Sequence, residues 1–250
     1  MPKAKHKRRS ILQYENAKTS KGKSLGYITG IMYLAPGNES GLINLCPSAS
    51  PGCLESCLFT AGRGAFQDIR NARIAKTEYF MRERAAFWFN LVKDIQALIR
   101  KCERENMQPC VRLNGTSDII FEKMVVDEKG NTIFDLFPGV AFYDYSKIAK
   151  RFSPGWKLPE NYHLTFSRSE TNQKDAERIA AAGHNVAVVF SGELPAEYAG
   201  RPVHDSDSHD LRFLDPAGVI CGLKAKGKAR KDSSGFVVPS RKLVFKKVGV

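Results

Sequence analysis

Residues 162–190 read YHLTFSRSETNQKDAERIAAAGHNVAVVF, and this stretch decides the fold class. An apolar run at 162–166 ends in a polar cluster at 167–170, and a second apolar run occupies 185–190. Between them, residues 172–182 have helical character and stop at Gly183, a residue typical of a helix C-terminus. A strand, a helix and a second strand in this order predict a βαβ unit, whose two strands lie parallel in one sheet.

The same alternation extends outward along the chain. Apolar runs that end in polar clusters recur at 110–113, 140–143 and 219–223, and one or two short strands are expected within 25–45. Helical spacing over 66–107 predicts two helices, because a single helix of that length would be about 60 Å long. We therefore expect an α/β fold with a parallel sheet, either open or barrel-shaped.

Sheets of this kind carry their chemistry at the carboxyl ends of the strands. Polar residues also end strands simply because loops are solvated, so the recurrence favours a shared polar mouth more than any single residue does. The residues that the pattern places there are Asp118, Asp144, Lys147, Arg168 and Glu170.

The 250 residues carry a net charge of +13, which is concentrated at the two ends. Residues 1–24 hold eight Lys or Arg against Glu15, and residues 224–250 hold nine against Asp232. The predicted organisation is a flexible basic arm (1–24), an α/β metal-binding domain (25–223) and a basic C-terminal segment (224–250). Basic ends favour nucleic acid as partner, because each neutralised phosphate releases counterions, although they also serve solubility alone.

The sequence contains no apolar run long enough to cross a bilayer, and no apolar region follows the basic N-terminus as it does in a secretory signal. We expect a soluble cytoplasmic protein with no membrane partner.

Three of the six cysteines fall in one loop, Cys46-Pro-Ser-Ala-Ser-Pro-Gly-Cys53-Leu-Glu-Ser-Cys57. Three cysteines can hold a [4Fe–4S] cluster and leave one iron open. Zn²⁺ usually requires a fourth protein ligand, which the loop does not supply, and three unligated thiols are the remaining interpretation. We favour the cluster, and we expect the isolated Cys102, Cys110 and Cys221 to be core residues.

The order strand, three-cysteine loop, helix, strand and Gly-containing turn resembles the start of the radical S-adenosylmethionine (SAM) enzymes. Their usual spacing is C-x3-C-x2-C, whereas this loop has C-x6-C-x3-C. The resemblance implies a partial (β/α) barrel with a [4Fe–4S] cluster whose open iron chelates SAM. It also implies that one electron cleaves the sulfonium to a 5′-deoxyadenosyl radical, which abstracts hydrogen from a substrate.

The resemblance further assigns residues to SAM and substrate. Ser167 and Arg168 match positions that contact ribose or carboxylate, and Gly218, Ile220 and Gly222 match the stretch on which adenine rests. The substrate would face Asp144, Tyr145 and Lys147. The turn expected to hold the methionyl group consists of Asn114, Gly115, Thr116, Ser117 and Asp118.

Much of the chain also resembles a family of bacteriophage proteins known by a gene-product label. The stretches that carry this likeness lie at 46–64, 112–118, 166–170 and 223–227. The likeness implies a phage protein acting in the host cytoplasm, and it implies no particular activity.

Other residues point to other chemistry. Arg63, flanked by glycines before the first long helix, suits phosphate or carboxylate binding, or else the glycines only shape the loop. His204-Asp-Ser-Asp207-Ser-His209-Asp210 could bind a divalent cation, although a solvated loop without fixed geometry is favoured.

The favoured function is therefore a radical SAM-like enzyme acting on a nucleic acid or nucleotide. One alternative is a non-enzymatic nucleic-acid-binding protein with a structural zinc or iron–sulfur site. Another is a divalent-metal nuclease that uses Asp118 and Asp144 as its carboxylate pair.

Overall fold

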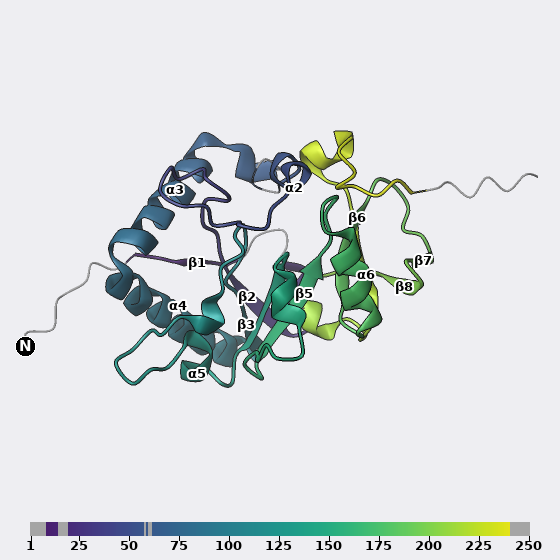
Figure 1. Cartoon of the computed structure of the whole chain (residues 1–250). Helices are drawn as coiled ribbons and strands as arrows, with labels where there is room; N and C mark the ends of the chain where they lie inside the picture. Colours follow the sequence, from purple (N-terminus) through teal and green to yellow (C-terminus); the bar gives the residue numbers. More distant parts are fainter. Residues whose placement is uncertain (1–8, 15–19, 58, 60–61, 241–250) are drawn as a thin grey trace, which may run out of the picture.

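The computed structural model of the chain describes residues 9–14, 20–57, 59 and 62–240. Its centre is a nine-stranded sheet in the order β1-β2-β3-β4-β5-β6-β9-β8-β7 (Figure 1). The strands are β1 (Leu12–Gln13), β2 (Tyr27–Met32), β3 (Gln108–Arg112), β4 (Ala141–Ser146), β5 (Tyr162–Ser167), β6 (Val186–Phe190), β7 (Glu197–Tyr198), β8 (Arg201–Asp205) and β9 (Ile220–Lys224).

The strands from β2 to β6, followed by β9, are all parallel, and each lies beside the one before it. Among these six strands the spatial order follows the sequence order, and it reverses only beyond β9, where β8 and β7 complete the edge of the sheet. Right-handed connections between consecutive parallel strands all fall on one face of a sheet, which leaves the other face to loops and ligands. The predicted α/β class with a parallel sheet is confirmed, but the sheet is not closed and has β1 and β7 as its edges.

The helices are α1 (Ser20–Lys23), α2 (Pro51–Glu55), α3 (Gln67–Arg82), α4 (Arg84–Glu105), α5 (Ile133–Leu136) and α6 (Gln173–Ala181). The two helices predicted within 66–107 are confirmed as α3 and α4, which join at Glu83, a residue with non-helical backbone angles. Helix α4 lies against β2 and β3 (Figure 1). Its apolar stripe, which includes Phe87, Leu91, Ile95 and Leu98, is buried in the largest core. Within the part of the chain that the structure describes, none of the helices combines the length and apolarity of a membrane span.

The described parts of both chain ends pack against the body. Ile11 and Leu12 are buried, and their backbone N–H groups donate to Asp94 Oδ2. Near the other end, Val238 forms a bridge with Phe190 of β6. Residues 9–14, which belong to the predicted flexible arm, thus contact the body, and Ser20–Lys23 form α1 beside β2, while residues 1–8 and 15–19 lie outside the described residues.

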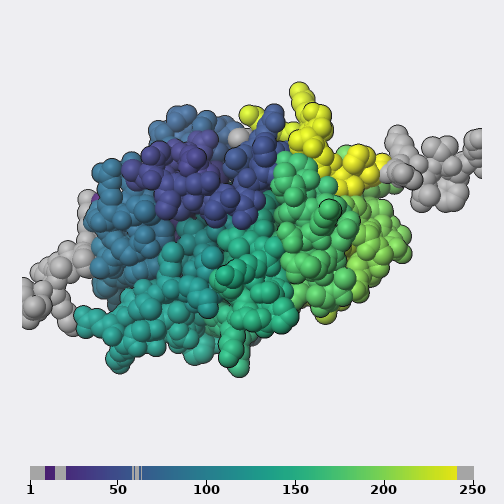
Figure 2. All heavy atoms as spheres, viewed as in Figure 1, coloured from purple at the N-terminus to yellow at the C-terminus, as the bar shows by residue number. Residues whose placement is uncertain are grey.

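The C-terminal segment 225–240 lies beside α2, as Figures 1 and 2 show. Its Phe236 and Val237 pack with Ala225, Ala229 and the half-buried Cys53. The last ten residues, 241–250, lie outside the described residues. This contact brings the end of the described chain onto the cysteine loop.

Candidate functional site

A cavity of about 560 Å³ lies at the carboxyl ends of the parallel strands. Its size is that of a small-molecule or cofactor site. Cys46, Cys53 and Cys57 all line it. The predicted residues that share it with the cysteines are Asn114, Gly115, Thr116, Ser117, Asp118, Tyr145, Lys147 and Ser167.

The cysteine loop is held in place by Glu170, which follows β5. Glu170 Oε1 accepts from the N–H of Gly52 (2.8 Å), and Oε2 accepts from Ser50 Oγ (2.7 Å). Ser50 in turn caps α2 by accepting from the N–H of Cys53 (3.2 Å). Glu170, a predicted site residue at the polar mouth of the sheet, is thus a positioning residue for the loop that carries the thiols.

Close packing also fixes this loop at Gly52. A Cβ atom there would lie 2.0 Å from Ser234 Oγ and 2.8 Å from Glu170 Oε1. Only glycine allows α2, Glu170 and the C-terminal segment to approach this closely.

The three cysteines are half-buried, and cations lie near them. Burial raises the pKa of Cys46 to about 12 and also raises the pKa of Cys57. Arg73 and Lys147 act in the opposite direction on Cys57. The Nη1 atom of Arg73 is buried and has no hydrogen-bond partner, while its guanidinium lies over the rings of Tyr33 and Phe59.

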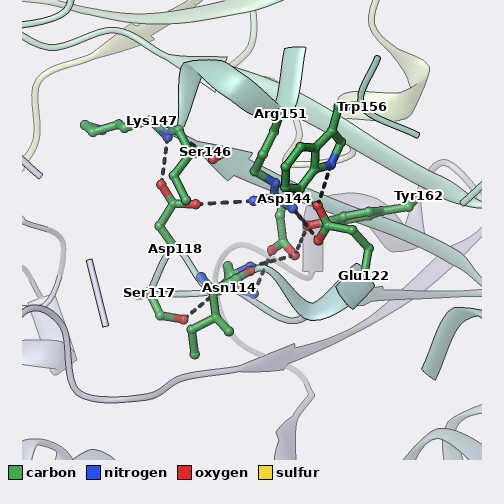
Figure 3. A network of polar contacts seen from close by, with 12 residues as sticks. Asn114, Ser117, Asp118, Glu122, Asp144, Ser146, Lys147, Arg151, Trp156 and Tyr162 are labelled. Carbon is green, nitrogen blue, oxygen red and sulfur yellow. Dashed lines mark hydrogen bonds and ion pairs between the residues drawn. The ribbon is translucent and has the colours of Figure 1, made fainter. Parts of the chain in front are cut away.

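The turn after β3 is folded by its own side chains and by Asp144 (Figure 3). Asn114 Oδ1 accepts from the N–H of Ile119 and from Ser117 Oγ, both at 2.8 Å, while the Asn114 N–H donates to Asp144 Oδ1 (2.7 Å). A Cβ on Gly115 would lie 2.6 Å from the carbonyl oxygen of Met32. The turn is therefore pressed against the end of β2, and the Cys46 thiol reaches it through the Thr116 carbonyl (3.7 Å).

Asp144 does not face the pocket. Its side chain is fully buried, and Oδ2 accepts from the Tyr162 hydroxyl (3.1 Å). Side chains alternate along a strand, so Asp144 shares its face with Phe142 and the core, whereas Tyr145 points into the pocket. Asp144, predicted to face substrate and to pair with Asp118, is therefore not among the residues that line the cavity, whereas Asp118 is.

We expect Asp144 to make stability depend on pH. Burial raises its pKa to about 7, against the lowering effects of Arg112 and the Asn114 N–H. Between pH about 4 and 7 the folded chain retains a proton that the unfolded chain has lost, so stability falls as pH rises. Urea unfolding of wild type and Asp144→Asn across this range measures the effect. The stability of wild type relative to the variant should decrease with pH, and a constant difference would contradict the shift.

A buried ionic network supports the pocket wall behind Asp118 (Figure 3). Arg151 makes two bonds to Glu122 (2.9 and 2.8 Å) and a third contact to Asp118 Oδ1 (3.3 Å). Asp118 Oδ2 accepts from the N–H of Lys147 (2.8 Å), and Trp156 Nε1 donates to Glu122 (3.1 Å). Neither Arg151 nor Glu122 exposes its side chain to solvent.

Lys147 lines the pocket, whereas Arg168 contacts the C-terminal segment. Lys147 Nζ donates to Ser167 Oγ (2.7 Å) and lies over the Phe236 ring, so both Lys147 and Ser167 line the pocket as predicted. Arg168 instead donates to the carbonyls of Gly235 and Phe236 and to Gln173. Arg168, predicted to contact a ligand, is not among the residues that line the cavity, and its guanidinium ties the C-terminal segment to the sheet.

The stretch expected beneath adenine is only partly at the pocket. The Ile220 side chain lies in the main core, and Gly222 faces Val203 and Leu194, where a Cβ would come within 2.7 Å of Val203. Leu223 and Lys224 line the pocket instead, with Ala187 and Val189 of β6. Gly218, which has φ +71°, lies in the turn before β9. Arg63 lies in the 3₁₀ turn Gly62–Ala65, and its side chain is outside the described residues.

The loop after β8 is ordered by long-range contacts. Arg112 pairs with Asp210 (2.9 Å) and lies over the Tyr145 ring, and Asp207 accepts from the N–H of Lys224 (2.8 Å). Asp207, His209 and Asp210 line the cavity. The segment is largely exposed or half-buried, as expected of a solvated loop, but these contacts give it a fixed geometry that was not predicted.

Sequence reasoning missed Arg73, Arg112, Glu122 and Arg151. Each is a charged residue in or beside a helix or strand, and its role depends on a partner distant in sequence. A weak signal existed for Arg112 alone, which stands inside an otherwise apolar strand.

The family model described as Gene product 88 matches residues 8–240. No curated protein and no solved structure matches the chain. The match confirms the predicted gene-product family, and the comparisons do not support the resemblance to radical SAM enzymes.

Proposed function

The chain belongs to the Gene product 88 family, and for this member we propose that the cavity holds a [4Fe–4S] cluster and SAM for radical chemistry. The observation that carries the proposal is that the three loop cysteines share one cavity with the turn after β3. The consecutive order of six parallel strands, expected of a partial (β/α) barrel, supports it as well. We also propose that the fold belongs to the partial (β/α) barrel class.

The donor set suits a cluster better than a single ion. In tetrahedral Zn²⁺–thiolate sites the sulfur atoms lie about 3.8 Å apart, given Zn–S bonds of about 2.3 Å. In the part of the chain that the structure describes, the sulfur atoms of Cys46, Cys53 and Cys57 do not all lie within 4.8 Å of one another. A cubane cluster takes more widely spaced thiolates.

The charges around the loop also fit an anionic metal–thiolate centre. Buried thiols with raised pKa values must lose protons on binding metal, and nearby cations favour that loss. Arg73 offers a buried Nη1 atom without a hydrogen-bond partner, and Lys147 lies at the pocket wall.

Each group in the cavity then has a role. A reduced cluster would supply the electron that cleaves SAM, and the substrate would lose a hydrogen atom. Cys46, Cys53 and Cys57 hold the metal, while Glu170 orients the helix that bears Cys53. The turn 114–118 faces the methionyl end, and the apolar Ala187, Val189 and Leu223 offer a surface for a flat ring.

The test is anaerobic reconstitution with iron and sulfide. We expect iron and sulfide in cluster stoichiometry, and an electron paramagnetic resonance signal of the reduced cluster that changes when SAM is added. A cluster whose signal ignores saturating SAM contradicts the radical function but leaves the metal site intact. A colourless protein with stoichiometric zinc contradicts both the cluster and the radical function, and it favours the alternative of a structural metal site.

An anionic substrate, a nucleotide or nucleic acid, is part of the same proposal. Lys21 from the N-terminal basic region lines the cavity together with Lys224 and Lys226 from the C-terminal one. Both basic regions therefore reach the same opening. Lys21 Nζ donates a hydrogen bond to the main-chain carbonyl of Asp207, and Lys226 forms an ion pair with the Asp207 carboxylate.

We expect the combined change of Lys21, Lys224 and Lys226 to Gln to weaken binding of DNA or RNA. The log–log salt slope should become shallower by about 0.9 for each lost duplex phosphate contact and by about 0.7 for a single strand. A matched control converts the exposed Lys93, Arg100 and Lys174 to Gln, with the same loss of charge. Equal losses in the two variants would mean that diffuse net charge, and not the pocket lysines, attracts the ligand.

A further inference from the structure

A second group of metal-binding side chains lies outside the cysteine loop, at His204, His209 and Asp215. His204 belongs to β8, His209 to the loop that follows, and Asp215 comes directly after the 3₁₀ turn Arg212–Leu214. One donor atom from each of the three residues lies within 4.8 Å of the other two. A strand and two turns thus bring two imidazoles and a carboxylate together.

The Asp215 carboxylate is held by one oxygen only. Oδ2 lies 2.9 Å from Arg212 Nη1, 3.0 Å from Ser206 Oγ and 3.3 Å from Cys221 Sγ. The side chain is fully buried, yet Oδ1 has no hydrogen-bond partner. The surrounding residues therefore orient the carboxylate and leave a free oxygen, which is the usual arrangement of a metal ligand supported by a second layer of hydrogen bonds.

The free oxygen faces both imidazoles across a gap. Asp215 Oδ1 lies 3.7 Å from His204 Nε2 and 3.9 Å from His209 Nε2. These separations exceed the 2.7–3.2 Å of an N–H···O hydrogen bond. An ion with bonds of about 2.0–2.2 Å to nitrogen and oxygen reaches both partners of each pair.

We propose that His204, His209 and Asp215 bind one divalent first-row transition-metal ion of the Zn²⁺ class. Imidazole and carboxylate donors suit such ions, and an ion between them would satisfy the buried oxygen. Three protein ligands leave a coordination position open. His209 also lines the large cavity, so the ion borders the pocket that the cysteines share.

The site is independent of the cysteine loop and can be tested apart from it. The experiment titrates Co²⁺ into full-length, chelator-treated protein, and into the same chain carrying Cys46→Ser, Cys53→Ser and Cys57→Ser. We expect one Co²⁺ per chain at the His204–His209–Asp215 group in both proteins, with the weak visible bands of nitrogen and oxygen ligands. Further Co²⁺ bound by the cysteine loop of wild type would add thiolate charge-transfer absorption, which should be missing from the triple variant.

Variants then assign the ligands. His204→Ala, His209→Ala and Asp215→Asn should each weaken Co²⁺ binding by at least about tenfold. Zn²⁺ should raise the melting temperature of wild type more than that of these variants, because it binds only the folded state. His204 is about one-third exposed, so its variant is informative even if Asp215→Asn fails to fold beside the buried Arg212.

His184→Ala and Asp68→Asn serve as matched controls, because they remove an exposed imidazole and an exposed carboxylate outside the group. Both should bind Co²⁺ as wild type does. Retention of Co²⁺ by folded His204→Ala and His209→Ala proteins would overturn the site. Failure of the folded cysteine triple variant to bind would also overturn it, by assigning all the metal to the thiols.

Discussion

Replacement of Cys46, Cys53 or Cys57 by Ala abolishes the visible absorbance of an iron–sulfur cluster after anaerobic reconstitution. All three thiols line one cavity, and a cluster with two remaining protein ligands loses the geometry that holds it. The expected loss is nearly complete for each single variant, since no other described cysteine lies at the pocket. Iron and sulfide content per chain, together with the absorption spectrum, measures the effect.

The matched control is Cys102→Ala. Cys102 lies on the buried face of α4 in the main core and does not line the pocket, so its removal costs some packing and leaves the pocket unchanged. This variant should retain the cluster at the wild-type level. Survival of the cluster in any one of the three loop variants would contradict the assignment of that thiol as a ligand.

Arg151→Met destabilises the protein by about 3–5 kcal/mol, because it leaves the buried carboxylates of Glu122 and Asp118 without their cation. The methionine retains much of the side-chain volume, which separates the charge effect from a cavity effect. Domains are stable by about 5–15 kcal/mol, so the loss is a large fraction of the total. The melting temperature should fall by roughly 2–4 °C for each kcal/mol.

The double variant Arg151→Met, Glu122→Gln is the control for this effect. Removing the Glu122 charge together with its partner should restore part of the lost stability, because a buried uncompensated charge is the main cost. Equilibrium urea unfolding compares the three proteins. An Arg151→Met variant within about 1 kcal/mol of wild type would show that water reaches the carboxylates, contrary to their burial.

The parallel strands and long helices were predictable because their signals are local. Residues 162–190 carry a strand, a helix with its glycine stop, and a second strand within one short window. The strands that escaped prediction are β1 and the β7–β8 hairpin. β1 and β7 have two residues each, and the β7–β8 hairpin is largely exposed. None of these three strands therefore stands out in the sequence as an apolar run.

The site was predictable only in part, for reasons that lie in strand geometry. Cys46, Cys53 and Cys57 and the turn at 114–118 were found because short spacing and glycine or proline content mark them. Asp144 and Ile220 were assigned to the wrong face, because position in a strand does not reveal which of its two faces looks into the pocket.

Long-range partners gave no local signal. The Arg151–Glu122 pair spans 29 residues, and Glu170 contacts Ser50 across 120. The convergence of His204 and His209 on Asp215 likewise required the fold, since Asp215 stands outside the run of His and Asp residues that drew attention in the sequence.

Phe236 is the last residue along the described chain that lines the pocket, and Arg168 donates a hydrogen bond to its carbonyl oxygen. The same segment packs Phe236 and Val237 near the half-buried Cys53. A chain that stops before residue 232 would therefore lack both one part of the cavity wall and the packing that covers the cysteine loop from that side.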